Sequence, residues 1–64
     1  MKNAQRTQTY YFNGEGPHTI AIDGRRVTYD GRAEMFRTSA AALSRYESDL
    51  RMMMKHPSYV VSAP

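Results

Sequence analysis

A chain of 64 residues is long enough for one small domain, and its lack of cysteine excludes a disulfide framework, a thiolate zinc site and a thiol nucleophile. Nine lysine and arginine residues against six acidic residues give a formal net charge of +3, milder than many nucleic-acid-binding modules carry. Domains of this size bury little surface and are marginally stable alone. We therefore expect oligomerisation or docking onto a partner to add stability.

The chain begins with a polar segment, which a cluster of aromatic residues interrupts. Residues 1–9 are typical of a flexible arm and lack the apolar core of a signal peptide. No run approaches the roughly 18 apolar residues of a membrane span, so we expect a soluble protein in a cytoplasm-like setting. Tyr10–Phe12, a run of aromatic residues, favours a strand. Glycine and proline in Asn13–Pro17 predict a turn or loop.

The segment His18–Tyr29 predicts a β-hairpin, because apolar and polar residues alternate on both sides of Asp23-Gly24. We expect this pair to form a two-residue type I′ turn, which places Ile22 opposite Arg25. The same register places Ile20 opposite Val27. One face of the hairpin then carries the apolar set Ile20, Ile22, Val27 and Tyr29.

A second turn signal, Asp30-Gly31, follows the hairpin. If Arg32–Arg37 continued as another strand, Arg32 and Glu34 would lie on the apolar face. We therefore expect a loop here that carries Met35 and Phe36 back toward the core.

The next segment predicts a helix, which Thr38 or Ser39 caps and Pro57 ends at about His56. Its apolar residues recur at helical spacing and form a stripe toward the hairpin. This stripe comprises Leu43, Tyr46, Leu50 and Met53, with Phe36 one heptad earlier and Met54 at its flank. Two ion pairs with (i, i+4) spacing are expected, Glu47–Arg51 and Arg45–Asp49.

The chain ends in a β-prone segment, Tyr59–Val61, which either returns to an edge of the hairpin sheet or adds to a neighbour's sheet. The sequence thus predicts an arm over residues 1–9, one domain over 10–57 and an extended tail over 58–64. The predicted fold is α+β: a β-hairpin or three-stranded antiparallel sheet packed on one C-terminal helix.

No pattern of catalytic or metal-binding residues accompanies these elements. His18 and His56 lie far apart, and neither begins a zinc-binding motif of two histidines. No serine stands in a recognisable nucleophile motif, and the glycines do not form a phosphate-binding loop. We therefore expect no enzymatic activity, no cofactor and no metal.

The remaining candidates concern interaction with other macromolecules. Met52–Met54 cannot all face one small core, so we expect Met52 to be either contacted by a partner or simply exposed. The candidate partner-binding residues are Tyr10, Tyr11, Met52, Tyr59, Val60 and Val61. An alternative function is nucleic-acid binding, with phosphate contacts from Arg25, Arg26, Arg32 and Arg37 and stacking on the aromatic residues. We favour the simpler interpretation, in which these arginines are solvated and the aromatic residues belong to the core.

The hairpin through Tyr29, the helix capped at Thr38 and the β-prone tail Tyr59–Ser62 together resemble small accessory proteins of tailed bacteriophage particles. Such proteins decorate capsids or occupy joints between head, neck and tail. The resemblance is one of general layout and covers the chain from about His18 onward. It implies a structural role in the cytoplasm or the virion, several copies, protein neighbours and no catalytic residues.

Overall fold

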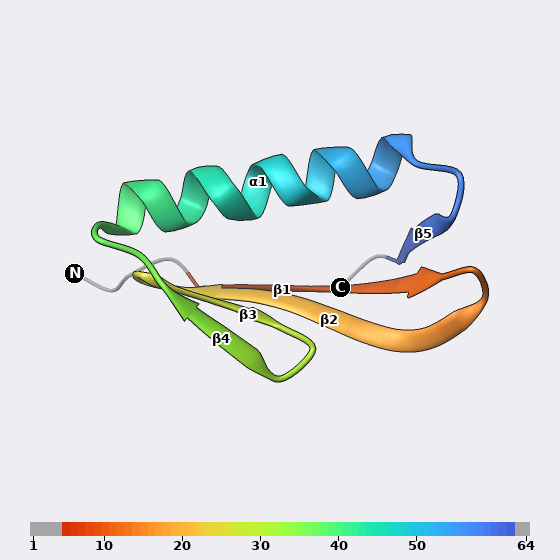
Figure 1. Cartoon of the computed structure of the whole chain (residues 1–64), viewed down its shortest axis with the longest axis horizontal. Coiled ribbons are helices and arrows are strands. Elements are labelled where there is room, and N and C mark those ends of the chain that lie inside the picture. The colour runs from red at the N-terminus through yellow and green to blue at the C-terminus, as the bar shows by residue number, and fades with distance from the viewer. Residues whose placement is uncertain (1–4, 63–64) are drawn as a thin grey trace.

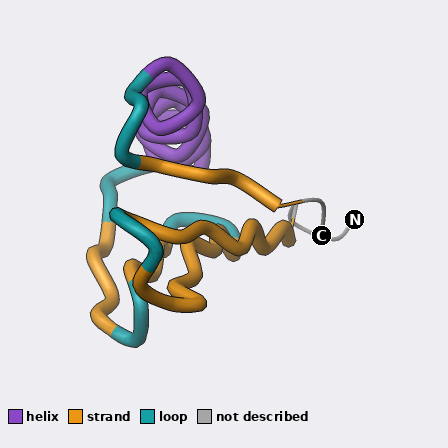
Figure 2. Tube along the Cα trace, turned by 90° about the vertical axis from the view of Figure 1, so that its right-hand side faces the viewer, coloured by secondary structure: helices purple, strands orange, loops and turns teal. Residues whose placement is uncertain are grey.

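A five-stranded antiparallel sheet with one helix across it forms the fold of this protein. The computed structural model describes residues 5–62. The sheet has the strand order β4-β3-β2-β1-β5, and α1 covers only one of its two faces (Figure 1, Figure 2). The predicted α+β class, with an antiparallel sheet packed on one C-terminal helix, is confirmed. The elements are β1 (Gln5–Phe12), β2 (Glu15–Asp23), β3 (Arg26–Tyr29), β4 (Arg32–Met35), α1 (Ser39–Lys55) and β5 (Tyr59–Ser62).

The first hairpin, β1 and β2, begins earlier in the chain than the sequence predicts. Gln5–Thr9, expected within a flexible arm, pairs with β2 from Asp23 back to Thr19, and residues 1–4 lie outside the described part. The expected loop at 13–17 is also too long, since β2 begins at Glu15. Asn13 and Gly14 form the turn, and both have positive φ, as a type I′ turn requires.

The second hairpin, β2 and β3, has the predicted faces but not the predicted register. Ile22 lies opposite Val27 and Ile20 opposite Tyr29, so each partner is displaced by two residues from the expected position. The turn is Gly24-Arg25, with a positive φ at Gly24 alone, which fits a type II′ turn. This register pairs apolar residues directly across the strands. A shift of two residues keeps every side chain on its predicted face.

The expected loop after Asp30-Gly31 is wrong, because Arg32–Met35 forms β4. Asp30-Gly31 is a two-residue turn, as predicted, and Glu34 lies opposite Val27 in the resulting hairpin. The side chains of Arg32 and Glu34 do lie on the apolar side of the sheet, opposite Tyr29 and Val27. They are tolerated there because β4 is an edge strand whose residues are all exposed, so neither charge is buried.

The helix begins and ends as the sequence predicts. The Thr38 hydroxyl accepts a hydrogen bond of 3.1 Å from the backbone N–H of Ala41, which identifies Thr38 as the N-cap. The C-cap is His56, directly before Pro57. The predicted pair of Arg45 with Asp49 is present at 3.4 Å, whereas Glu47 pairs with Arg6 on β1 at 3.7 Å instead of with Arg51. No helix among residues 5–62 is long and apolar enough to cross a membrane.

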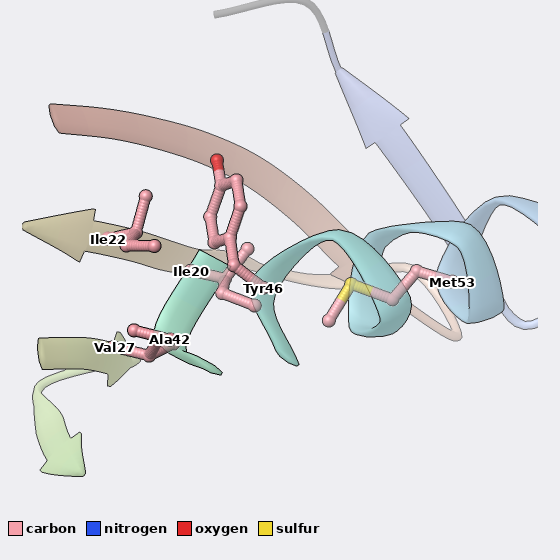
Figure 3. Close-up of a cluster of buried hydrophobic side chains, with 6 residues drawn as sticks. All are labelled: Ile20, Ile22, Val27, Ala42, Tyr46 and Met53. Atoms are coloured by element: carbon pink, nitrogen blue, oxygen red, sulfur yellow. The ribbon is translucent and has the colours of Figure 1, made fainter. Parts of the chain in front are cut away.

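The hydrophobic core lies between α1 and the covered face of the sheet (Figure 3). Around it, Leu43 and Leu50 of the predicted stripe are half-buried, and Met54 is exposed rather than packed at the flank. Ala42, which the sequence does not single out, is completely buried, because a small side chain lets the helix approach the sheet. The buried core residues are Ile20, Ile22, Val27, Ala42, Tyr46 and Met53.

The C-terminal segment belongs to the protein's own sheet. Tyr59–Ser62 forms β5, which pairs antiparallel with β1. Of the two destinations predicted for this segment, the structure shows the return to an edge of the protein's own sheet. The backbone N–H of Asn13 also donates a hydrogen bond of 2.8 Å to the carbonyl of Ser58. Residues 63 and 64 of the predicted tail lie outside the described part.

Candidate functional site

The face of the sheet opposite α1 has no cover among residues 5–62, and we call it the open face (Figure 2). Side chains alternate along a strand, so the register determines which residues lie on this face. The central strands contribute mainly threonine and alanine, which make it low and even. Its residues are Gln5, Thr7, Thr9, Tyr11, Thr19, Ala21, Asp23, Arg26, Thr28, Ala33, Met35 and Val60.

Larger apolar side chains lie at two opposite ends of the open face. Tyr11 is half-buried and lies opposite Val60 of β5, which is 61% exposed. A Cβ atom at Gly16 would lie 3.0 Å from Cδ2 of Tyr11, so the absence of a side chain there makes room for the tyrosine ring. At the other end, Met35 of β4 is also 61% exposed and lies opposite Arg26.

The structure divides the six predicted partner-binding residues among three environments. Tyr11 and Val60 lie on the open face. Tyr10, Tyr59 and Val61 instead pack against the core on the side of α1, where each is half-buried.

The third environment is the outer surface of α1. Met52 is 53% exposed there, and Met54, which the sequence did not select, is 71% exposed. Of these three consecutive methionines, Met53 alone packs in the core, and it is 5% exposed. Met35, which the sequence predicts to turn inward toward the core, is a further exposed residue.

The aromatic residues beside β5 form a packed cluster rather than a stacking platform for bases. The Tyr10 ring is stacked on His18, with 5.3 Å between the ring centroids. The Tyr59 ring lies 4.8 Å from that of Phe12 and 5.8 Å from that of Tyr10, centroid to centroid. Burial, followed by the nearby charge of Asp30, raises the pKa of the Tyr10 phenol.

The four candidate phosphate-binding arginines do not converge on one site. Nη1 of Arg25 lies 3.5 Å from the carbonyl oxygen of Arg37, so these two residues are neighbours. Arg26 lies on the open face and forms an ion pair of 3.6 Å with Asp23. Arg32 lies at the far end of β4, beside the Asp30-Gly31 turn. The arrangement offers at most one pair of arginines to a phosphate group.

A groove of about 420 Å³ lies beside β4 on the α1 side of the sheet. At its wall the Tyr29 hydroxyl donates a hydrogen bond of 2.7 Å to the Asp49 carboxylate. Burial, together with this hydrogen bond, raises the pKa of Tyr29 to about 12. The Tyr29 phenol therefore stays protonated at neutral pH and acts as a structural donor. The groove is lined by Tyr29, Arg32, Ala33, Glu34 and Arg45.

A second groove, of about 400 Å³, lies between the first half of β1 and α1. β5 pairs with β1 only over Thr9–Phe12. On the side that faces away from β2, Gln5–Gln8 therefore has no neighbouring strand among the described residues. The groove is lined by Gln5, Arg6, Thr7, Gln8, Tyr46 and Leu50.

The two histidines have separate local roles. Nδ1 of His18 lies 2.9 Å from a carboxylate oxygen of Asp30, and Nδ1 of His56 accepts a hydrogen bond of 3.2 Å from the backbone N–H of Ser58. Among residues 5–62, no three histidine, aspartate or glutamate side chains gather as metal ligands would. Comparison with protein-family models, curated proteins and solved structures found no match to this chain.

Proposed function

We propose that this protein is a non-enzymatic structural or adaptor protein that binds another protein through the open face of its sheet. The observation that carries the proposal is the one-sided packing of the fold. α1 covers one face, while the other presents exposed Val60 and Met35 around a low surface of threonine and alanine. An even surface of methyl-bearing side chains suits close packing against a second protein surface.

The charge of the open face supports a protein partner over a nucleic acid. Its two charged residues, Arg26 and Asp23, have opposite sign and pair with each other. Nucleic-acid affinity depends on unpaired positive charge near the phosphate backbone. Binding here would instead rest on apolar contacts and on threonine hydroxyls as hydrogen-bond partners.

Small size gives a thermodynamic reason for a partner. A 64-residue chain without cysteine has no covalent cross-link to reinforce its core. Any ligand that binds only the folded state stabilises that state by mass action. We propose a larger assembly with several copies of the chain as the setting. A tailed phage particle, which the resemblance suggests, stays a prediction.

The test is site-specific photocrosslinking in the cells that naturally produce the protein. A photoreactive amino acid replaces Val60 on the open face, and a matched variant carries it in place of Met54 on the outer face of α1, since both side chains are well exposed. We expect one defined protein to crosslink in high yield at position 60 and not at position 54. Equal yields at both positions, or no adduct at position 60, would contradict the proposal.

The alternative, nucleic-acid binding, rests on the neighbouring arginines Arg25 and Arg37. Duplex and single-stranded oligonucleotides titrated at low and at physiological salt test it directly. Phosphate contacts give an affinity that falls steeply as salt rises. We expect no binding at either salt concentration, and a salt-dependent affinity that Arg25→Ala reduces would favour the alternative.

A further inference from the structure

β4 presents a free backbone edge of the sheet, since its only neighbour in the described chain is β3. The backbone N–H of Phe36 donates a hydrogen bond of 2.8 Å to the carbonyl of Arg25, which lies opposite it. Hydrogen-bonded pairs alternate along antiparallel strands, so Glu34 and Arg32 also bond to β3. The N–H and C=O groups of Ala33 therefore point outward, where a further strand would pair.

The side chains along this edge have a simple charge pattern. Arg32 and Glu34 are two residues apart, so both project on the α1 side of the sheet, opposite Tyr29 and Val27. Both are exposed, and none of the ion pairs among residues 5–62 includes either of them. Ala33 projects between them on the open face.

We propose that β4 pairs antiparallel with β4 of a second copy of this chain, about a two-fold axis that passes through Ala33. In that register Ala33 faces the partner's Ala33, and the two residues exchange N–H···O=C hydrogen bonds. Arg32 of each copy lies opposite Glu34 of the other. The interface thus contains two symmetric ion pairs between oppositely charged side chains.

The charge pattern selects this register among the possible ones. A two-fold axis perpendicular to the sheet keeps both helices on one side, so each residue must face a partner residue from the same side of the sheet. An axis through Arg32 places two arginines opposite each other, and an axis through Glu34 places two glutamates opposite each other. Like charges directly across two strands are destabilising. Of these three axes, only the one through Ala33 places Arg32 of each copy opposite Glu34 of the other copy.

The paired positions also have suitable geometry for contact. Because Ala33 and its copy form a hydrogen-bonded pair, Arg32 and the partner's Glu34 form a non-hydrogen-bonded pair. Side chains approach each other most closely at such positions. Charges on an edge strand ordinarily prevent strand addition. Here their alternating sign prevents the wrong registers and stabilises one.

β5, at the opposite edge of the sheet, has no comparable signal. Its sequence, Tyr59–Ser62, contains no charged residue, so no register of self-pairing is selected by charge. Pairing through β4 closes a symmetric dimer and produces one continuous sheet with both open faces on the same side. This dimer does not depend on the proposed function, because it uses a different surface.

Charge reversal with sedimentation equilibrium tests the proposal. We expect the native protein to reach twice its 7.3 kDa mass at millimolar concentration. Arg32→Glu and Glu34→Arg each place like charges opposite each other in the dimer, so each weakens dimerisation roughly tenfold or more. An equimolar mixture of these two variants restores opposite charges and forms a heterodimer. The double variant Arg32→Glu/Glu34→Arg restores the homodimer.

A matched control and a backbone variant complete the test. Arg51→Glu makes the same change of charge at an exposed position of α1 and leaves dimerisation unchanged. The backbone N–H of Ala33 points away from β3 and makes no hydrogen bond to it. Ala33→Pro removes this N–H, so we expect the dimer to dissociate while the circular dichroism spectrum of the folded chain is retained. A native monomer at millimolar concentration would overturn the proposal. A dimer whose dissociation constant is unchanged by charge reversal would also overturn it, as would an equimolar mixture of the two variants that forms no heterodimer.

Discussion

The hydroxyl of Tyr29 on β3 donates a hydrogen bond of 2.7 Å to the carboxylate of Asp49 on α1. It links β3, the strand next to the edge strand β4, to the middle of α1. Nε of Arg45 lies 3.4 Å from the same carboxylate, which gives Asp49 a second, charged partner. This contact fixes the position of the helix over the β3–β4 hairpin.

We expect Tyr29→Phe to lower the free energy of unfolding by about 1.5 kcal/mol, the lower end of the range for hydrogen bonds to charged groups. The phenyl ring retains its packing, so the loss reports the hydroxyl. Urea denaturation measures the change. Arg45→Ala removes the more exposed partner of Asp49 and serves as the comparison, with a clearly smaller loss, as is typical of exposed ion pairs. Equal losses in the two variants would contradict the special role of Tyr29.

The raised pKa of Tyr29 also predicts loss of stability at alkaline pH. Because the folded-state pKa, about 12, exceeds the ordinary value of 10, folding favours the protonated phenol. Its stabilising contribution is complete below pH 10 and is lost as the pH rises toward 12. Tyr10 and Tyr46 also have raised pKa values, mainly through burial, and add to the loss. Thermal unfolding measured between pH 8 and 11 should show a smaller decline for Tyr29→Phe than for the native protein.

The adjacent methionines of α1 provide a matched pair for the core. Met53 is 5% exposed and Met54 is 71% exposed. We expect Met53→Ala to cost about 2–5 kcal/mol, through lost burial and a cavity. Met54→Ala should change stability by less than about 0.5 kcal/mol. Because the domain is marginal, Met53→Ala is expected to be largely unfolded by circular dichroism, and similar melting of both variants would refute the assigned packing.

Removal of residues 58–64 distinguishes a docking tail from a structural strand. The deletion removes β5, one of the two strands that pair with β1, and exposes Tyr10 and Phe12, which Tyr59 contacts. We therefore expect the truncated chain to lose cooperative unfolding, monitored by far-ultraviolet circular dichroism. A single substitution, Val61→Asp, should reproduce much of the effect because Val61 packs against the core, whereas Val60→Asp on the open face should not. A truncated chain that melts cooperatively would show that β5 is dispensable.

The helix and the faces of the central hairpin follow from local rules, which explains why the sequence predicts them. Thr38 provides the cap and Pro57 the stop, and both act within a few residues. Side-chain alternation on β2 and β3 is equally local. The exact register is not, because Asp23-Gly24 and Gly24-Arg25 both provide acceptable turns. The contact between Ile22 and Val27 decides between them.

The sheet edges were harder to predict because their residues do not look buried. Gln5–Thr9 is polar, yet it forms the larger part of β1, since Thr7 and Thr9 suit an open face and Arg6 reaches Glu47. Arg32 and Glu34 argue against a strand only if the α1 side is covered as far as β4. The destination of β5 depends on where α1 ends, which is a tertiary feature. Of the candidate binding residues that the sequence offers, Tyr11, Val60 and Arg26 lie on the open face. The sequence does not show that this face is left uncovered, because that depends on where α1 packs.

The pairing of β1 with β5 joins residues about fifty positions apart, as Tyr10 and Val61 show. Contacts this distant in sequence form late during folding, because the chain must first lose the entropy of the intervening loop. Until α1 forms and brings β5 into place, Tyr10–Phe12 exposes aromatic side chains along an unprotected strand. An exposed strand of aromatic residues without a neighbour favours aggregation. The rate at which the last strand docks therefore sets how long a newly made chain is vulnerable to aggregation.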